Sequence, residues 1–130
     1  MRYMLLIYKN EPWWDTLSPQ EQRKVVEEAR DYSEPRRASG FYLGGERLAG
    51  TDTATVVRVK DGKPIITDGP FAETKEQLAG YTILDAKNLD EALDFVAHHP
   101  LTRRGLPIEI RPMREGPGEP DTGPRPVPRG

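Results

Sequence analysis

A short segment in the second half of the chain carries the side chains best suited to chemistry. Asp68, Glu73, Lys75 and Glu76 place three carboxylates and one ammonium group within nine residues. Carboxylates held close together in a partly apolar cleft can be shifted to different pKa values, so that one acts as an acid and the other as a base. We therefore predict Asp68 and Glu73 as catalytic residues for an isomerisation or enolisation that needs no metal.

The same segment also has a purely structural interpretation. Asp68-Gly69-Pro70 is typical of a turn, and Phe71 would anchor that turn in the core. Residues 73–76 would then form a solvated loop with local ion pairs. Both interpretations stay open at the level of the sequence.

Five further residues are candidates for ligand binding. Lys75 can hold an anionic group, and Glu46, which follows two glycines, can face a pocket from the end of a strand. Tyrosine hydroxyl groups can also bind a ligand, although such tyrosines more often pack in a core or an interface with their tips satisfied. The tyrosines considered are Tyr3, Tyr8 and Tyr81.

The sequence predicts neither a metal site nor an organic cofactor. The chain has no cysteine, and the consecutive His98 and His99 diverge by about 100° on a helix, so they cannot bind one metal ion. At the C-terminal end of a helix a protonated imidazole interacts favourably with the helix dipole, and we predict this capping role for both histidines. The glycine pairs fit no dinucleotide or phosphate-loop motif.

Composition narrows the class of protein. The 130 residues include 19 basic and 21 acidic side chains, and this balance gives no electrostatic reason to expect nucleic acid or an anionic membrane as a partner. No apolar run approaches the length that crosses a bilayer, and the N-terminus lacks the features of a secretory signal. Together with the absence of cysteine, this predicts a cytoplasmic protein.

Residues 1–114 are predicted to form one folded domain, and residues 115–130 a flexible arm rich in proline and glycine. A capping box at Ser18 and Glu21 marks the start of a helix at Pro19, and Pro35 makes its last turn irregular. A second helix starts after Asn88 and stops at Pro100, and residues 10–17 are expected to be a loop. Strands are predicted at 3–8, 41–48, 53–60, 63–67, 79–85 and 108–112, with a bulge or close approach at Gly44-Gly45 and a tight turn at Asp61-Gly62.

This order, β-α-β, a hairpin, then β-α-β, predicts an α+β fold with a ferredoxin-like sheet and both helices on one face. Strand 3–8 is apolar on both sides, so the second face of the sheet also needs a cover. A chain of this length has no third layer to supply that cover. We therefore expect a homodimer that forms through the sheet face.

Residues 68–76, with the sequence DGPFAETKE and followed by Gly80-Tyr81, resemble the signature of the YCII-related family, in the branch called DGPF. Residues 2–8, 44–48 and 108–112 also resemble that family. The resemblance implies a dimeric α+β barrel, as in muconolactone isomerase-like proteins. It also implies that members occur singly or joined to extracytoplasmic-function sigma factors.

The chain departs from one pattern of this family. Some YCII relatives are proposed to use a His–Asp pair whose histidine lies on the first helix, but residues 19–37 contain no histidine. Arg30 is the nearest polar candidate on that helix.

Three functional hypotheses follow. The first is a small-molecule pocket between sheet and helices, with cofactor-free acid/base chemistry on a small organic acid or ring compound. The second is a non-catalytic accessory or ligand-sensing module linked to transcription by sigma factors, and the third is an interaction domain in which the 68–76 motif only fixes a turn. A solvent-connected cavity lined by two or more of the candidate carboxylates would favour the first two.

Overall fold

The computed structural model describes residues 1–116, which form an α+β fold around one four-stranded antiparallel sheet. The strands lie in the order β2-β5-β1-β6, and β3 and β4 form a separate hairpin. The elements are β1 (Arg2–Lys9), α1 (Glu11–Thr16), α2 (Pro19–Ser33), a 3-10 turn (Glu34–Arg36), β2 (Tyr42–Arg47), a second 3-10 turn (Thr51–Thr53), β3 (Thr55–Lys60), β4 (Lys63–Asp68), β5 (Gln77–Asp85), α3 (Leu89–Ala97), α4 (Pro100–Arg103) and β6 (Ile108–Pro112).

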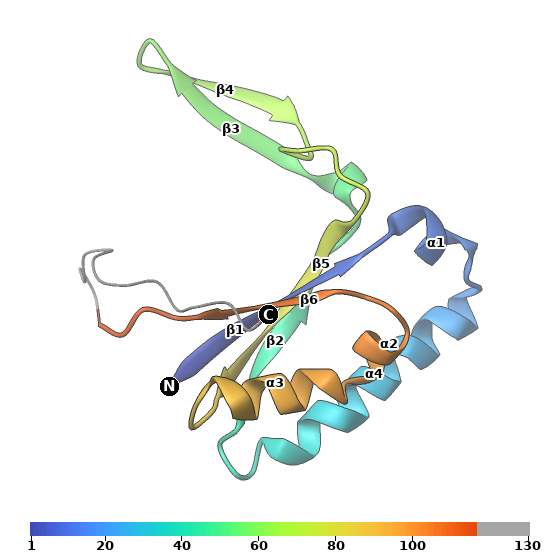
Figure 1. Ribbon diagram of the computed structural model, residues 1–130. Helices are drawn as coiled ribbons and strands as arrows, with labels where there is room; N and C mark the ends of the chain where they lie inside the picture. The colour runs from blue at the N-terminus through green and yellow to red at the C-terminus, as the bar shows by residue number, and fades with distance from the viewer. Residues whose placement is uncertain (117–130) are drawn as a thin grey trace.

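The predicted order of strands and helices is confirmed. The central strand β1 pairs antiparallel with β5 on one side and β6 on the other, and β2 pairs with β5 at the edge. The helices α2 and α3 lie on one side of this sheet, and the β3–β4 hairpin projects on the opposite side (Figure 1). One face of the sheet is therefore left without a helical cover.

The core lies between the sheet and the helices. Leu5 on β1 and Leu84 on β5 are fully buried, and they pack with Phe95 and Ala92 of α3. A second cluster joins Val25 of α2 to Leu101 and Leu106, at and beyond α4. The alternation along β1 places Tyr3, Leu5 and Ile7 toward the helices, so the intervening Met4 and Leu6 face the uncovered side.

Local sequence signals set the ends of α2. The Ser18 hydroxyl accepts a hydrogen bond from the Glu21 amide at 3.1 Å, and the Glu21 carboxylate accepts one from the Ser18 amide at 3.0 Å. This reciprocal pair is the predicted capping box, and it satisfies two amides that a helix start leaves unpaired. At the other end the helix passes into the 3-10 turn Glu34–Arg36, which contains Pro35.

The expected loop at residues 10–17 is wrong, because residues 11–16 form the short helix α1. The Asn10 side chain caps it by accepting a hydrogen bond from the Trp13 amide at 2.8 Å, and Pro12 occupies its first turn. An asparagine cap followed by a proline in the first turn is a usual helix start, and Asn10 and Pro12 form this pattern before the two tryptophans. Pro100 similarly starts α4 as well as ending the preceding helix.

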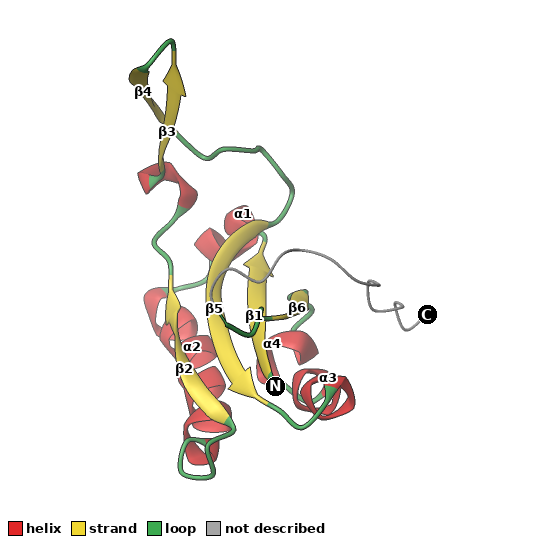
Figure 2. Cartoon of the chain, turned by 90° about the vertical axis from the view of Figure 1, so that its left-hand side faces the viewer, coloured by secondary structure: helices red, strands yellow, loops and turns green. Residues whose placement is uncertain are grey.

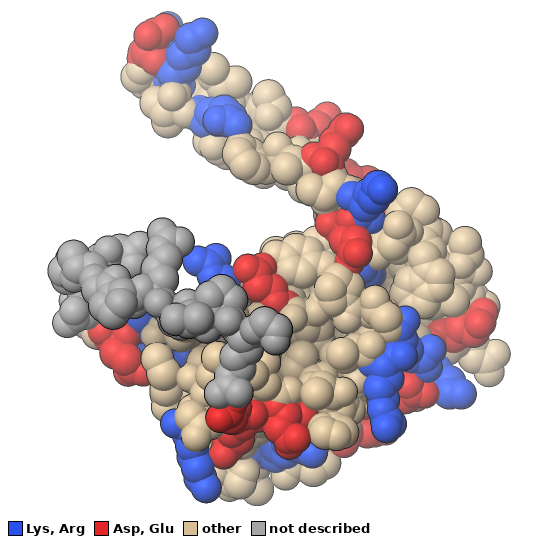
Figure 3. Space-filling view, in the orientation of Figure 1, with Lys and Arg blue, Asp and Glu red and all other residues tan. Residues whose placement is uncertain are grey.

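The β3–β4 hairpin stands away from the sheet, beyond the ends of β2 and β5 (Figure 2). Its turn is the predicted one, with positive φ at Asp61 (51°) and Gly62 (74°). The apolar side chains Val57 and Ile66 are 61% and 68% exposed, so the hairpin has little core of its own. A hollow with largely uncharged walls separates it from the body in Figure 3.

Helix α1 holds both connections to the hairpin. Glu11 accepts hydrogen bonds from the amide of Thr51, at 2.9 Å, and from its hydroxyl group. The Asn10 side chain donates to the Lys75 carbonyl at 3.2 Å, and the Glu11 amide donates to the Gln77 side chain at 2.8 Å. The bonds from Thr51 lower the pKa of Glu11, so its carboxylate form is the one that fixes the hairpin linker.

Residues 117–130, most of the predicted arm, lie outside the described part of the chain. Within residues 1–116, no helix has the length and apolarity to cross a membrane.

Candidate functional site

A cavity of about 470 Å³ lies between α2 and the helix-facing side of strands β1, β2 and β5. Its apolar walls come from the sheet, from α2, from α4 and from the segment that follows α4. The apolar lining residues are Ile7, Val25, Val26, Ala29, Leu101 and Leu106. Because Val25, Leu101 and Leu106 belong to the second core cluster, the cavity sits at an incomplete part of the packing between sheet and helix.

Four cationic side chains border this cavity: Lys9, Arg30, Arg37 and Arg47. Arg37 makes two hydrogen bonds to the Glu34 carboxylate, at 2.9 and 3.0 Å. None of the other three has an ion pair with a carboxylate among residues 1–116. The cavity therefore carries an excess of positive charge.

Two of the unpaired cations, Lys9 and Arg47, lie near Trp14. The Lys9 ammonium lies 4.1 Å from the centroid of the Trp14 ring, and the Arg47 guanidinium lies 6.0 Å from it. Burial lowers the pKa of Lys9, and the nearby charge of Arg47 lowers it further. Both effects outweigh the opposing charges of Glu11 and Asp15, so the ammonium form is less favourable here than in water, and an anion placed between Lys9 and Arg47 would offset that cost.

His99 reaches the cavity from the start of α4. Its side chain is buried, and its Nδ1 accepts a hydrogen bond from the Leu101 amide at 3.1 Å. The rings of Tyr32 and Phe95 pack against the imidazole with centroids 5.1 and 5.7 Å away. Burial, with a smaller contribution from Arg36, lowers the pKa of His99 to about 4, so the ring is neutral near pH 7.

The expected capping role is therefore divided between the two histidines. The exposed His98 does contact the end of α3, with its Nδ1 2.8 Å from the Asp94 carbonyl. For His99 the expectation is wrong, because this residue caps the next helix, α4, from a buried position. His98 ends α3, whereas His99 has extended backbone and begins α4, so the two side chains do not share one helix end.

Two of the predicted ligand-binding residues, Glu46 and Tyr81, border the cavity. They are paired across β2 and β5, next to the Gly45–Thr82 pair. Because side chains alternate along a strand, these two adjacent pairs face opposite sides of the sheet. Thr82 also pairs with Leu5, which faces the helices. Strand alternation thus directs the Glu46 and Tyr81 side chains toward the uncovered face, with their backbone at the cavity wall.

The close backbone approach predicted at the glycine pair is confirmed, and it forms part of the cavity wall. Gly44 has φ +111° at a bulge in β2. A Cβ on Gly45 would lie 2.1 Å from the Tyr81 carbonyl oxygen, and one on Gly80 would lie 2.6 Å from the Glu46 carbonyl oxygen. Larger residues at these two positions would force β2 and β5 apart.

The other two tyrosines lie away from the cavity. Tyr3 is a core residue, 4% exposed, whose hydroxyl donates to the Met1 sulfur at 3.3 Å. Tyr8 donates to the Glu109 carboxylate at 3.0 Å, and this hydrogen bond raises the pKa of Tyr8.

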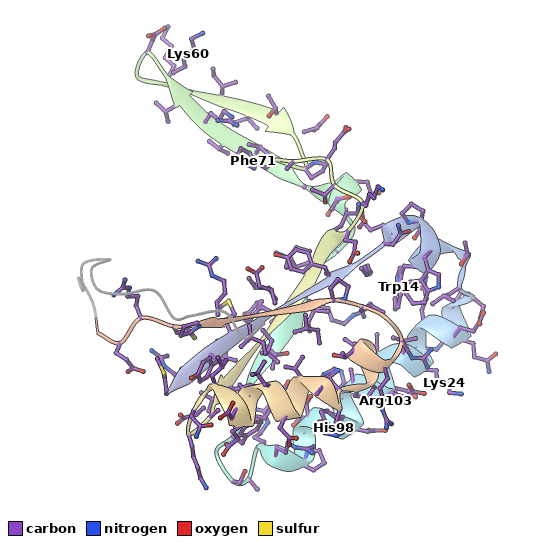
Figure 4. The ribbon with its side chains drawn as sticks, viewed as in Figure 1. Trp14, Lys24, Lys60, Phe71, His98 and Arg103 are labelled. Atoms are coloured by element: carbon purple, nitrogen blue, oxygen red, sulfur yellow. The ribbon has the colours of Figure 1, made fainter. Side chains whose placement is uncertain are left out.

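Asp68, Glu73 and Lys75 are exposed, at the end of β4 and in the loop that follows, and none of them lines the cavity. The expectation that Phe71 anchors this loop in the core is wrong, because Phe71 is 74% exposed, and the Arg58 guanidinium lies 5.0 Å from its ring. Figure 4 shows Phe71 beside the hairpin, far from Trp14 near the junction of α1 and α2. The catalytic role of Asp68 and Glu73 stays a prediction.

Comparison with known proteins fits this architecture. The model of the YCII-related domain matches residues 1–115. The chain belongs to the YCII-related family. An uncharacterised protein of Rhizobium meliloti (strain 1021) is 41% identical over 98 residues, which cover 73% of this chain and 77% of that protein.

A solved structure shares the fold of this YCII-related protein. It is 5-chloro-2-hydroxyhydroquinone dehydrochlorinase from Burkholderia phenoliruptrix AC1100, in complex with 2,5-dihydroxybenzoquinone. The match has a TM-score of 0.51 at 19% identity and covers 89% of this chain and 96% of the other. At this identity the likeness concerns the fold.

Among residues 1–116, no group of three or more His, Cys, Asp or Glu side chains is arranged to hold a metal ion. The charged groups at the cavity are chiefly Lys and Arg, which do not bind metal ions as cations. The arrangement is instead suited to holding the negative charge of an organic molecule.

Proposed function

We propose that this YCII-related protein binds a small organic anion in the cavity between α2 and the sheet. The observation that carries the proposal is the group of three cations, Lys9, Arg30 and Arg47, beside an apolar wall. In the described part of the chain these cations have no ion pair with a carboxylate. An acidic group of the ligand would pair with the cations, and its apolar body would contact the wall. Sites for small molecules commonly combine these two features.

A ring compound is the body that suits this cavity best. Its volume of about 470 Å³ lies within the usual range for small-molecule sites. Trp14 and Tyr42 border it and offer aromatic surface. The fold relative holds 2,5-dihydroxybenzoquinone, an acidic six-membered ring, and this analogy supports the same class of ligand.

We expect removal of one unpaired cation to weaken binding strongly. Arg47→Gln should lower the affinity for 2,5-dihydroxybenzoquinone and for benzoate about tenfold, because a charge-assisted hydrogen bond is lost. Isothermal titration calorimetry at constant ionic strength measures both affinities. Arg23→Gln removes the same charge from an exposed residue outside the cavity, and it should change both affinities by less than about twofold. Equal effects of the two substitutions would contradict the proposed site.

Whether the bound anion is turned over separates an enzyme from a sensor. For the enzyme, cofactor-free acid/base chemistry with Asp68 or Glu73 as the base stays our proposal, although neither residue lines the cavity within one chain. Loss of turnover in Asp68→Asn without loss of folding would support this role. Binding without turnover would favour the alternative, an accessory or ligand-sensing module linked to sigma factors.

The uncovered face of the sheet supports a homodimer. It presents apolar side chains of β1 and β5, and the β3–β4 hairpin, which carries exposed apolar side chains, projects on the same side of the sheet (Figure 1). The sheet residues are Met4, Leu6, Leu78 and Ile83, and the hairpin residues are Val57, Val59 and Ile66. A second copy placed there would hide about 800 Å² on each partner if the interface has the usual size.

A charge on this face should prevent assembly. Ile83→Arg puts a cation opposite Met4, in the middle of the uncovered face. We expect sedimentation at micromolar concentration to give the 14.7 kDa mass of one chain for this variant and twice that mass for the unmodified protein. Glu27→Arg, on the exposed face of α2, should leave the mass unchanged. A single-chain mass for the unmodified protein would contradict the dimer.

A further inference from the structure

His99 is a buried side chain of which one ring nitrogen is hydrogen-bonded within the protein and the other is not. It is 3% exposed, and its Nδ1 is occupied as an acceptor for the Leu101 amide. An imidazole nitrogen that accepts a hydrogen bond carries no proton, so the proton of the neutral ring lies on Nε2. Within residues 1–116, the His99 ring makes no other hydrogen bond, and Nε2 is not among the fully enclosed polar atoms that lack a partner, so it keeps some exposure to solvent.

The surroundings keep this ring in one orientation and one charge state. Tyr32 and Phe95 pack edge-on against it, and the Tyr32 hydroxyl is itself fixed by a 2.7 Å hydrogen bond to the Phe95 carbonyl. The charged group near the imidazole is Arg36, whose guanidinium lies 4.3 Å from the Tyr32 ring centroid. Burial and this positive charge both oppose protonation of His99. The ring is therefore a fixed, neutral hydrogen-bond donor.

His99 lines the same cavity that the unpaired cations border. Because Nε2 keeps some exposure to solvent, water can bind it in the free protein, and a ligand oxygen that accepts its hydrogen bond would replace that water. The cations can hold a full negative charge, whereas a neutral N–H favours a carbonyl, hydroxyl or ether oxygen as well. The cavity thus offers two chemically distinct contacts.

We propose that His99 is a specificity-determining residue that donates a hydrogen bond from Nε2 to a second oxygen of the bound organic anion. This inference rests on the proposed anion-binding function. The ligand class is narrowed to ring acids that carry an oxygen acceptor in addition to the acidic group. A ring acid without the second oxygen can pair with the cations, but it offers no acceptor to His99.

Two substitutions separate the donor from the helix cap. In His99→Asn the side-chain oxygen can accept from the Leu101 amide as Nδ1 does, but no group reaches the position of Nε2. In His99→Gln the amide nitrogen can reach the position of Nε2, whereas the cap is lost. A purely structural role predicts that Asn is the better replacement, and the proposed role predicts that Gln is the better one for binding.

The two probes are 2,5-dihydroxybenzoquinone, with oxygens around its ring, and benzoate, with its carboxylate alone. We expect His99→Asn to weaken the quinone about tenfold and benzoate by less than about twofold, and His99→Gln to retain most of the quinone affinity. Calorimetry gives the affinities, and thermal unfolding of each variant reports its folding.

In ¹⁵N-histidine spectra of the unmodified protein, the Nε2 resonance of His99 should shift on addition of the quinone and stay in place with benzoate. Equal loss of both ligands in His99→Asn, or no loss of either, overturns the role of His99 while the Arg47→Gln result decides the anion site. Failure of the unmodified protein to bind either probe overturns both proposals.

Discussion

Acidification from pH 7.5 to pH 4 should lower the free energy of unfolding by about 3 kcal/mol through His99 alone, because its pKa is about 4 in the folded protein and 6.5 when exposed. Below pH 6.5 the unfolded chain binds a proton that the folded chain does not. The stabilisation is therefore complete above pH 6.5 and is lost as the pH falls toward 4. About 2 kcal/mol of this loss should have occurred by pH 5.

Urea unfolding at a series of pH values, with the protein concentration held fixed, measures this slope. The interval from pH 6.5 to pH 5 is the informative one, because it isolates His99. The pKa of Glu11 lies below its ordinary 4.5, so the stability that its carboxylate contributes is lost only at lower pH. His99→Asn should remove most of the slope, whereas His98→Asn, at the exposed neighbouring histidine, should keep it. An unmodified protein whose stability is constant over this interval would contradict the buried, neutral state of His99.

The second large effect is expected in the core. Leu84→Ala should destabilise the folded chain by about 2–5 kcal/mol, because Leu84 is fully buried between β5 and the helices and its loss leaves a cavity. Ile83→Ala, one residue earlier, removes a similar side chain from the uncovered face of the same strand. Its cost should depend on protein concentration if a second copy covers that face, and the cost of Leu84→Ala should not.

Chemical denaturation at two protein concentrations distinguishes the two positions. A loss below about 1 kcal/mol for Leu84→Ala would mean that the core relaxes around the change and that the sheet-to-helix packing is looser than its burial indicates. Identical behaviour of the two variants would instead remove the distinction between a covered and an uncovered face.

Features that depend on a few neighbouring residues could be predicted from the sequence. The capping box of α2, the Asp61-Gly62 turn and the bulge at Gly44 are each determined by local hydrogen bonds or by the sign of φ, and all three are confirmed. Helix α1 was missed although it has the same kind of signal, because its six residues show too little periodicity to be read as a helix.

The candidate site was less predictable because residues far apart in the sequence form it. Lys9, Arg30 and Arg47 come from β1, α2 and β2, and only the sheet order brings them to one cavity. Sequence patterns drew attention to the 68–76 motif, whose charged residues are close in the chain but lie outside that cavity. The signal for His99 was Pro100, since a polar residue before a proline at a helix start is a common cap.

The projecting β3–β4 hairpin should unfold locally more easily than the rest of the protein. Two strands without a core are barely stable alone in water, and the β3–β4 strands bury almost nothing against their own body. Their amide protons should then exchange with solvent long before those of β1 and β5, unless another molecule rests on them. Slowing of that exchange as the protein is concentrated would make this arm the most sensitive reporter of association in the chain.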